Sequence, residues 1–496
     1  MNADYDLVVI GGGINGAGIA RDAAGRGLKT LLCEKGDFAE GTSSRSGKLV
    51  HGGLRYLEYY EFRLLREALI EREVLLRAAP HIVWPMRFVL PHSPEQRPAW
   101  MVRIGLFLYD HLGGREKLPA SRALDLRRAP EGVPVKDAFP RGFEYSDCWV
   151  DDARLVVLNV LDAARRGAAV RPRTAAASAR RADGLWQVTL DDHNGTTEIV
   201  TARILVNAAG PWVAEVMRGV AGLNTKAAVR LVKGSHIVVR KFWSGKQAYL
   251  LQNDDKRVIF VNPYEDDLCL IGTTDIAYDG AAEDVAVEDA ERRYLLRVVN
   301  RYMKTQLTEQ DILGEFSGVR PLYDDRAANP SAVTRDYVFD IDHRPGEAPL
   351  LSVFGGKITT YRKLAEHALD KLKPFLNGAS GAWTGTAVLP GGNMKDADFD
   401  GFLAAFSREF PFLPAALALH YARLYGTRAR EMLGDARDMG SLGQHFGGLL
   451  YEIEAEFLRR TEWARTAEDV LLRRTKHGLH TTAAEQQDFA HWMAAS

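Results

Sequence analysis

Leu7-Val8-Val9-Ile10-Gly11-Gly12-Gly13-Ile14-Asn15-Gly16 is the stretch that decides the fold of this chain. An apolar run ends there in a glycine turn, and a second apolar run, Leu31-Leu32-Cys33, ends in Glu34. The order of strand, tight turn, helix, strand and acid is typical of a dinucleotide-binding unit. The pattern therefore predicts a Rossmann-like α/β domain that binds an adenine dinucleotide, and it disfavours an ordinary glycine turn in a nucleotide-free sheet.

Five residues of this unit are candidates for binding the cofactor. Gly13 lets the backbone approach a pyrophosphate, which sits on the amides at the N-terminus of the next helix. Glu34 is placed to accept a hydrogen bond from a ribose hydroxyl. The full set is Gly11, Gly13, Asn15, Gly16 and Glu34.

Length, charge and cysteine content limit the classes of protein. The 496 residues are too many for one ordinary core and predict two or three domains. A formal net charge of -1 predicts no nucleic-acid partner. Three scattered cysteines without a CxxC pair favour a reduced, cytoplasmic compartment and predict no metal site, whether zinc or iron–sulfur.

The chain carries no sign of a targeting or membrane-spanning segment. A strand of the buried type begins almost at the first residue, so we expect no signal peptide. No apolar run approaches the roughly 20 residues that span a bilayer. Attachment to a membrane surface stays open.

Periodicity predicts the elements that follow the glycine turn. Apolar residues recur at helical spacing over 54–79, which predicts a long amphipathic helix that ends before Pro80. Residues 186–201 alternate around Asn194-Gly195 and predict an antiparallel hairpin. The apolar run 203–212 ends in small residues, so we expect it to return to the nucleotide-binding sheet.

The second half of the chain revisits the same pattern. Strand-like segments over 231–276 predict one mixed sheet. Residues 350–354 form an apolar strand, and Gly355-Gly356-Lys357 and a helix over 361–372 follow it. This repeat of the opening pattern predicts that the first domain is discontinuous.

These patterns predict three domains. The dinucleotide-binding domain takes residues 1–80, 150–215 and 345–375, and the substrate domain takes 81–149 and 216–344. After Leu389-Pro390-Gly391-Gly392 the pattern turns helical, over 402–406, 415–425 and 449–458. Residues 389–496 are therefore expected to form a C-terminal α-helical domain.

Residues 42–56, Thr-Ser-Ser-Arg-Ser-Gly-Lys-Leu-Val-His-Gly-Gly-Leu-Arg-Tyr, closely resemble the second FAD signature of FAD-dependent glycerol-3-phosphate dehydrogenases. The resemblance covers essentially the whole chain and is strongest to the bacterial aerobic, respiratory enzymes. It implies the glycine oxidase and D-amino acid oxidase type of FAD domain, a mixed-sheet substrate domain and a helical cap. The further blocks, in the family's order, are 141–147, 233–236, 271–275, 317–322 and 354–362.

Two related groups differ from this chain. The anaerobic enzymes carry cysteine motifs for an iron–sulfur partner system, and those motifs are absent from this sequence. The oxygen-using glycerol-3-phosphate oxidases typically carry an extra insertion in mid-chain, and no surplus segment separates the blocks here. A dehydrogenase is therefore favoured, and a soluble oxidase that makes hydrogen peroxide stays the alternative. A non-enzymatic FAD-binding protein is disfavoured, because it would not need the cationic candidates described next.

The resemblance implies oxidation of sn-glycerol 3-phosphate to dihydroxyacetone phosphate, with hydride transfer to FAD. Three arginines are candidates for the phosphate, because a guanidinium group forms charge-assisted bidentate hydrogen bonds. They are Arg55, Arg320 and Arg335. For any one of them a surface ion pair is the alternative, and Asp336 makes that alternative strongest for Arg335.

The hydroxyls of Tyr56 and Thr273 are proposed partners for substrate oxygens. Thr274 could replace Thr273, because neighbouring residues of a strand face opposite sides. Lys357 is placed at the flavin edge, where a cation stabilises an anionic reduced ring, and a surface lysine is the alternative.

Two histidines compete as the general base that removes the hydroxyl proton. His236 is the first choice, because an imidazole titrates near neutral pH and the residue lies in a block that resembles the site. A hydrogen-bonded core histidine is the alternative reading. His51 is the rival base.

The resemblance also implies that FAD is bound without a covalent link. The residues that match the family's cofactor-binding positions, besides those of the glycine turn, are Thr42, Ser43, Ser44, Lys48, Leu49, His51, Gly52, Gly53, Leu54, Ala208, Gly210, Trp212, Arg320, Gly355, Gly356, Lys357 and Thr359.

The electron acceptor is the least readable part of the sequence. Residues 98–109 are strongly apolar, with Arg97 just before them and Arg103 among them, which suits either an interfacial segment beside anionic lipid or a buried helix. The basic stretch 63–77 is another docking candidate. The resemblance favours a peripheral enzyme on the cytoplasmic face of the inner membrane that reduces ubiquinone, and it leaves a homodimer open.

Overall fold

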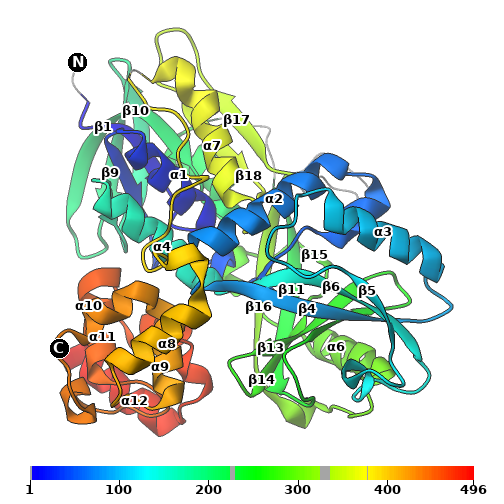
Figure 1. Ribbon diagram of the computed structural model, residues 1–496. Coiled ribbons are helices and arrows are strands. Elements are labelled where there is room, and N and C mark those ends of the chain that lie inside the picture. The colour runs from blue at the N-terminus through cyan, green and yellow to red at the C-terminus, as the bar shows by residue number, and fades with distance from the viewer. Residues whose placement is uncertain (1–2, 224–228, 324–335, 377, 496) are drawn as a thin grey trace.

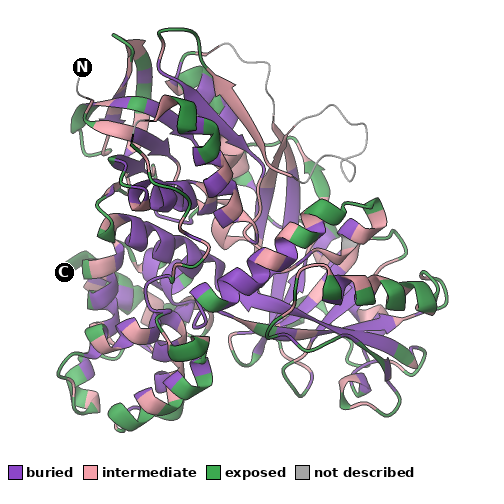
Figure 2. Cartoon of the chain, turned by 45° about the horizontal axis from the view of Figure 1, so that its top comes forward, coloured by how far each residue is buried: buried purple, intermediate pink, exposed green. Residues whose placement is uncertain are grey.

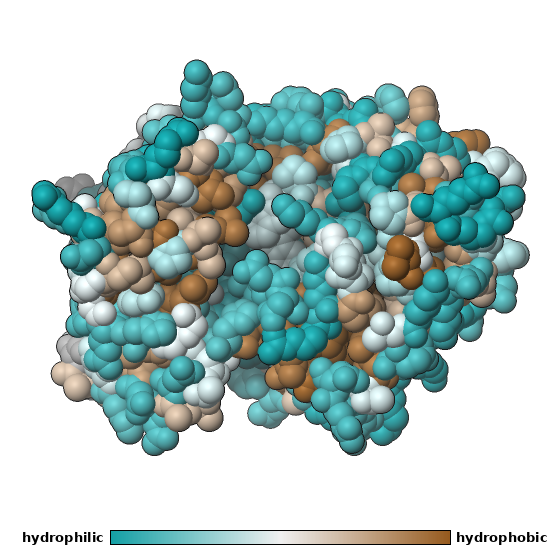
Figure 3. All heavy atoms as spheres, turned by 60° about the horizontal axis from the view of Figure 1, so that its bottom comes forward, coloured by the Kyte–Doolittle hydropathy of each residue, from teal (hydrophilic) through white to brown (hydrophobic). Residues whose placement is uncertain are grey.

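The computed structural model describes residues 3–223, 229–323, 336–376 and 378–495, and the side chain of Arg55 is not described. Two sheets and a C-terminal group of helices build the molecule (Figure 1). The predicted Arg335 lies outside the described residues. Charged and polar residues cover most of the face drawn in Figure 3, with the apolar residues in small patches among them.

The first sheet is the predicted dinucleotide-binding sheet. Strand β1 (Tyr5–Ile10) pairs in parallel with β2 (Thr30–Cys33) and with β10 (Thr197–Asn207). Strand β10 also pairs in parallel with β18 (Leu350–Phe354), so the late return of the chain to this sheet is confirmed. The sheet is completed by β7 (Ala169–Arg171), β8 (Ala175–Ala182), β9 (Leu185–Asp191) and β17 (Val338–Asp342).

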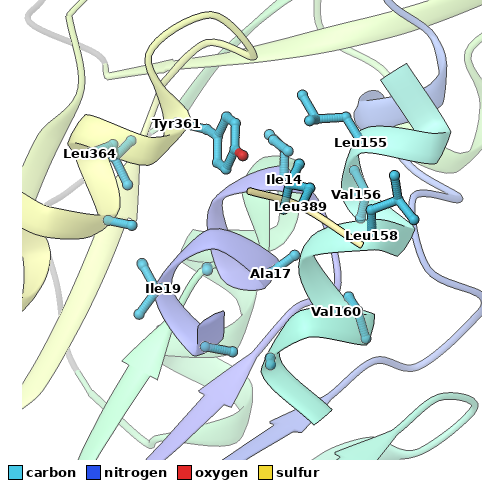
Figure 4. Close-up of a cluster of buried hydrophobic side chains, with 14 of the residues drawn as sticks. Ile14, Ala17, Ile19, Leu155, Val156, Leu158, Val160, Tyr361, Leu364 and Leu389 are labelled. Atoms are coloured by element: carbon cyan, nitrogen blue, oxygen red, sulfur yellow. The ribbon is translucent and has the colours of Figure 1, made fainter. Parts of the chain in front are cut away.

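Both faces of this sheet are buried, which explains the unbroken apolar run of β1. Leu7 and Val9 belong to the core shared with the helices α1 (Ile14–Gly25), α4 (Asp152–Arg165) and α7 (Tyr361–Leu372). Figure 4 shows side chains of these helices filling the space between them. Val8 and Ile10 point the other way, into a second core beneath the β8–β9–β10 ribbon.

The second sheet confirms the predicted mixed sheet. Its order is β15-β11-β14-β13-β12-β4-β6-β3, with β16 beside β11 and β5 beside β6. Helix α6 (Asp289–Tyr302) covers one face, while α2 (Phe62–Ala78) and α3 (Ala99–His111) contribute to the core of the other. The strands are β3 (Leu49–Val50), β4 (Val83–His92), β5 (Arg122–Asp125), β6 (Arg141–Val150), β11 (Val229–Arg240), β12 (Ala248–Gln252), β13 (Val258–Tyr264), β14 (Leu268–Gly272), β15 (Ile276–Tyr278) and β16 (Ile312–Tyr323).

Two details differ from the sequence-based expectations. The predicted long helix over 54–79 is wrong at its start: residues 54–59 form a 3-10 turn, Tyr60 is left-handed at φ 57°, and α2 begins only at Phe62. The amphipathic spacing continued across the break because Leu54 and Leu57 pack against the same core as α2. In addition, β3 and β17 pair across the predicted domain boundaries, which otherwise stay a prediction.

The C-terminal residues form the expected helical domain around one apolar core (Figure 1). Its helices are α8 (Phe399–Glu409), α9 (Ala415–Tyr425), α10 (Ala429–Leu433), α11 (Glu452–Glu462) and α12 (Ala483–Ala495). Figure 2 shows that the buried residues concentrate in the sheets, in the helices against them and on the inner sides of these helices.

Buried ion pairs hold this domain against the first sheet. Arg473 and Arg474 both donate to the carboxylate of Asp37, which follows β2, at 2.6 and 2.7 Å. Arg154 of α4 pairs with Glu462 of α11, and all of these side chains are almost fully buried. A buried carboxylate of this kind stabilises only while its partners remain.

Replacing Asp37 by asparagine should therefore loosen the C-terminal domain. The change leaves Arg474 without a carboxylate, and breaking a buried pair costs about 3–5 kcal/mol. We expect a lower unfolding temperature and faster proteolysis within residues 389–496. The control Asp125→Asn removes a carboxylate whose partner Arg127 is exposed, and there we expect no measurable change. An Asp37→Asn protein as stable as the wild type would contradict this account.

Candidate active site

A cavity of about 700 Å³ lies where the two sheets meet. Its walls come from the segment 42–58, from residues 356–359 after β18, and from strands β11, β13, β14 and β16. Helix α3 closes another side of the same cavity. The blocks singled out in the sequence therefore meet in one place, although they lie far apart along the chain.

The glycine turn sits at the carboxyl end of β1. A Cβ atom on Gly16 would lie 1.9 Å from the Gly11 carbonyl oxygen, and one on Gly11 would lie 2.6 Å from the Ala208 carbonyl oxygen. Packing thus requires glycine at both positions. A Cβ atom on Gly13 would meet only the Ser43 hydroxyl, at 3.1 Å, so this glycine faces a more open space at the start of α1.

Glu34 and Asn15 surround this turn. The Glu34 carboxylate accepts hydrogen bonds from the amides of Gly12, at 2.6 Å, and Gly36, at 2.8 Å. Burial raises the pKa of Glu34, although these two donors oppose the shift. Asn15 donates to the Gly355 carbonyl at 3.0 Å, while its buried Oδ1 has no hydrogen-bond partner among the described residues. The helix N-terminus suits an anionic group such as the pyrophosphate of a dinucleotide, while the Asn15 Oδ1 acceptor requires a donor such as a hydroxyl.

The segment 42–54 runs from this turn into the cavity. Thr42, Ser43, Leu49, His51, Gly53 and Leu54 line the cavity, as does Thr359, whose hydroxyl accepts from the His51 amide. Gly52 instead donates its amide to the Tyr109 hydroxyl.

Lys48 stands apart from that lining set. Its ammonium group forms a buried pair with Asp152, at 2.8 Å, and donates to the Ser44 carbonyl. The structure therefore gives Lys48 a position behind the cavity wall.

The remaining predicted cofactor residues lie at the carboxyl ends of β10 and β18. Gly210, Gly355 and Gly356 all have positive φ angles, of 57°, 73° and 94°. A Cβ atom on Gly356 would lie 2.8 Å from the Asn15 side chain, so the two glycine turns pack against each other. Trp212 stacks against Lys35 at 4.3 Å and donates to Glu283.

The predicted substrate residues Arg320 and Thr273 meet on the far wall of the cavity. The Arg320 guanidinium group donates to Asp275 at 2.9 Å and lies 3.5 Å from the Thr273 hydroxyl. Thr274 points away, because its hydroxyl is buried and donates to Glu291 at 2.7 Å. Of the two threonines that the sequence left open, Thr273 is the one in the cavity.

Lys357 lies across the cavity, with its ammonium group 4.1 Å from the centre of the Tyr56 ring. Burial lowers the pKa of Lys357 to about 7. Among the described residues no carboxylate pairs with it. A cation without a counter-charge in a cavity is a natural contact for an anionic ligand.

His236 is buried in the cavity wall and stacks on Phe316, with ring centres 4.9 Å apart. Burial, followed by the positive charges of Arg320 and Lys48, lowers the pKa of His236 to about 3. Its Nδ1 has no hydrogen-bond partner among the described residues. A hydrogen-bonded core histidine is therefore not supported at Nδ1, and with this low pKa His236 is a weak base.

Sequence reasoning assigned no role to two residues of the cavity wall, Arg45 and Asn262. Arg45 lay inside the quoted block and donates to the Ser317 carbonyl at 3.3 Å. Asn262 is buried on β13, and its Oδ1 has no hydrogen-bond partner in the part of the chain that the structure describes. The sequence signal for it is a lone polar residue in an apolar strand.

Comparison with known proteins gives the family. Residues 6–362 match the family described as FAD dependent oxidoreductase, and residues 382–494 match the C-terminal domain of alpha-glycerophosphate oxidase. The chain is 62% identical to D-erythritol 1-phosphate dehydrogenase of Brucella abortus over 488 residues, which cover 98% of this chain and 97% of the relative. It is 54% identical to aerobic glycerol-3-phosphate dehydrogenase of Escherichia coli, with the same coverage.

Solved structures agree with the fold. Glycerol-3-phosphate dehydrogenase from Bacillus halodurans, complexed with FAD, superimposes with a TM-score of 0.79 at 29% identity and covers 99% of this chain and 90% of its own. Glycine oxidase from Geobacillus kaustophilus matches at a TM-score of 0.54, 20% identity, 76% of this chain and 97% of its own, which supports the fold alone. The predicted family, fold class and cofactor are thus confirmed. The chain belongs to the FAD-dependent oxidoreductases, in the group that includes the aerobic glycerol-3-phosphate dehydrogenases, and FAD is its cofactor.

Proposed function

We propose that this protein oxidises the secondary alcohol of sn-glycerol 3-phosphate to the ketone of dihydroxyacetone phosphate. The observation that carries the proposal is the cavity that holds two cations, Arg320 and Lys357, together with the hydroxyl of Thr273 and the ring of Tyr56. These groups suit a small phosphorylated alcohol. When bound, FAD supplies the hydride acceptor.

The FAD-binding residues are proposed from the turn outward. Gly13 and the first amides of α1 receive the pyrophosphate, and Glu34 accepts from the ribose. The Asn15 Oδ1, which has no partner among the described residues, is placed to accept a hydrogen bond from a hydroxyl of the cofactor. The segment from Thr42 to Leu54 and residues 355–359 enclose the remainder of the cofactor where they line the cavity.

Arg320 is proposed to bind the substrate phosphate. Asp275 holds the guanidinium group by one nitrogen, which fixes its direction and leaves other N–H groups for a ligand. About 41% of the Arg320 side chain is exposed to the cavity and solvent, so an anion can reach it. Arg55 and Arg335 stay proposals from the family resemblance.

Lys357 is proposed to meet the flavin edge. Its pKa of about 7 means that much of it is neutral at neutral pH. An anionic group beside Lys357 would favour the charged form and raise that pKa. The lysine would then offset negative charge that develops as hydride arrives.

The general base is proposed to be His236 or His51. The low pKa of His236 follows partly from Arg320, so a phosphate that neutralises Arg320 would make the imidazole more basic. His51 also lines the cavity. It therefore stays the rival of the first choice, His236.

A second substrate, D-erythritol 1-phosphate, follows from the 62% identity to D-erythritol 1-phosphate dehydrogenase. Both compounds are polyol phosphates with a secondary alcohol, and they differ by one hydroxylated carbon. The deciding experiment compares kcat/KM for the two compounds and for glycerol, with flavin bleaching under anaerobic conditions as the readout. Equal rates with glycerol and with either phosphate would exclude a phosphate-binding active site.

Helix α3 is the proposed contact with the membrane and with ubiquinone. Trp100, Ile104 and Phe107 are 63%, 51% and 55% exposed, whereas Leu106 and Tyr109 are buried. One side of this helix thus belongs to the core and the other is an exposed apolar face, beside Arg97 and Arg103. In the described part of the chain, every helix is too short or too polar to cross a bilayer.

The cavity also points to this helix. Met101, Val102, Gly105 and Leu108 of α3 line the cavity that holds Lys357, so apolar side chains connect the two. We propose peripheral binding to the cytoplasmic face of the inner membrane, with ubiquinone reduced through this apolar side. A homodimer stays open.

FAD binding should depend on Gly13. Gly13→Val adds a branched side chain where the backbone is proposed to meet the pyrophosphate, and only the Ser43 hydroxyl lies near in the structure. We expect folded protein with strongly reduced flavin per chain, measured by absorbance after purification. The control Gly219→Val places the same side chain in open space and should keep full flavin. A Gly13→Val protein with full flavin content would refute the assignment.

Phosphate recognition should depend on Arg320. Hydrogen bonds to charged groups contribute about 1.5–3 kcal/mol, so Arg320→Ala should raise KM for glycerol 3-phosphate roughly 10- to 150-fold. Glycerol itself should remain a very poor substrate of the wild type. The control Arg292→Ala removes a surface arginine on α6 and should leave KM unchanged. An unchanged KM for Arg320→Ala would show that other residues bind the substrate phosphate.

Quinone reduction should depend on the exposed face of α3. Trp100→Asp and Phe107→Asp should lower reduction of a ubiquinone analogue on anionic vesicles more than reduction of a soluble dye, with flavin content intact. The control Ile199→Asp alters an apolar residue of β10 that is 65% exposed, and should spare both reactions. The oxidase alternative would be supported if lipid did not change quinone reduction by the wild type and the wild type made stoichiometric hydrogen peroxide in air.

A further inference from the structure

A cluster of potential metal ligands lies inside the C-terminal domain, and none of its members lines the active-site cavity. His420 comes from α9, Glu454 from α11, and His477 from the turn 477–479. One ligand atom from each lies within 4.8 Å of the others. The His420 Nε2 atom is 2.8 Å from one Glu454 oxygen, and the His477 Nε2 atom is 3.2 Å from the other.

These spacings suit a tetrahedral metal. Zinc binds imidazole nitrogen and carboxylate oxygen at about 2.0–2.2 Å, so ligand atoms at tetrahedral angles lie roughly 3.4 Å apart. The atoms of the cluster bracket that separation, and small side-chain movements would open the space for an ion. Two histidines and one glutamate also form a ligand set that zinc uses in proteins.

We propose that His420, Glu454 and His477 bind one zinc ion, or a divalent transition metal ion of the same class. This proposal departs from the expectation of no metal site, which was argued from cysteine spacing and did not consider histidine and glutamate ligands. Its ligands are separated by 34 and 23 residues along the chain, so no short motif marks them.

The surroundings of the cluster match a metal site. Glu454 and His477 are buried, and 12% of the His420 side chain is exposed, so water can reach a fourth coordination position from that side. The Tyr425 hydroxyl donates to Glu454 at 2.7 Å, as outer-shell partners of a liganding carboxylate do. The site would therefore have one water and three protein ligands, one of which is a carboxylate held in place by Tyr425.

The metal would fasten the C-terminal domain internally and to the rest of the molecule. It would join α9 and α11 to the segment that follows Arg474. Arg474 itself forms an ion pair with Asp37. Lys476, next to His477, pairs with Asp151 at the start of α4. We expect a structural role, because the ion would stabilise this arrangement only in the folded chain.

The competing explanation is a set of hydrogen bonds in which both imidazoles donate to the Glu454 carboxylate and no ion binds. The two explanations differ in measurable zinc content. The test uses the full-length, FAD-loaded protein without a polyhistidine tag, stripped with a chelator and then titrated with Zn²⁺ alone. Bound zinc is measured by mass spectrometry, and affinity by competition with a chromophoric chelator.

We expect one zinc per chain in the wild type. His420→Gln, which keeps a hydrogen-bond donor at the partly exposed position, should weaken zinc binding by more than the 10- to 100-fold typical of outer-shell changes. The control His445→Gln removes an exposed histidine of the same domain and should bind like the wild type. Glu454→Gln is a less useful variant, because the buried carboxylate accepts three hydrogen bonds and its loss could unfold the domain.

Anomalous diffraction and the unfolding temperature test the zinc site independently of the binding measurement. Crystals of the zinc-loaded protein should show an anomalous peak at the zinc absorption edge between the three side chains. Removal of zinc should lower the unfolding temperature of the wild type and leave that of His420→Gln unchanged. A folded, yellow wild type that binds no zinc, or a His420→Gln protein that binds it equally well, would overturn the proposal.

Discussion

Parallel pairing of β1, β10 and β18 is the constraint on which the rest of the structure depends. It brings the carboxyl ends of three strands from distant parts of the chain to one edge of the sheet. Each end must then be followed by a small residue, because the turns touch: Gly11 lies against Ala208, and Gly356 lies against Asn15. The cofactor edge of the sheet thus depends on close packing of these turns, and one larger side chain in them would separate the strands that form it.

Two lysines near the cavity differ in whether a carboxylate pairs with them. Lys48 is paired with Asp152 and supports the cavity wall from behind. Lys357 lines the cavity but has no carboxylate partner among the described residues, and burial lowers its pKa to about 7. A lysine without a counter-charge in a cavity suits an anionic ligand, whereas a paired lysine stabilises the fold.

The C-terminal domain is coupled to this centre through buried charges. Asp37 lies just beyond Glu34 and binds two arginines of that domain, while Asp151 and Asp152 at the start of α4 bind Lys476 and Lys48. Asp151 thus binds the C-terminal domain, and its neighbour Asp152 binds the cavity wall. A metal in the cap would strengthen an arrangement that already reaches the residues near the cofactor.

The sequence by itself determined the dinucleotide fold, the hairpin of 186–201, the late strand at 350–354 and the family. These features depend on local periodicity and on glycine turns, whose requirements are met within a few residues. It also placed Arg320, Thr273, Lys357 and His236 in candidate blocks, because each block is contiguous.

Only the tertiary structure decided which of the candidate side chains share a cavity and which are held in ion pairs or hydrogen bonds elsewhere. It turned Thr273 inward and Thr274 toward Glu291, it paired Lys48 with Asp152, and it interrupted the predicted 54–79 helix at Tyr60, so that α2 begins at Phe62. It also assembled His420, Glu454 and His477 from three separate elements. The physical reason is that burial, counter-charges and ligand geometry are set by neighbours distant in sequence, and periodicity along the chain carries no record of them.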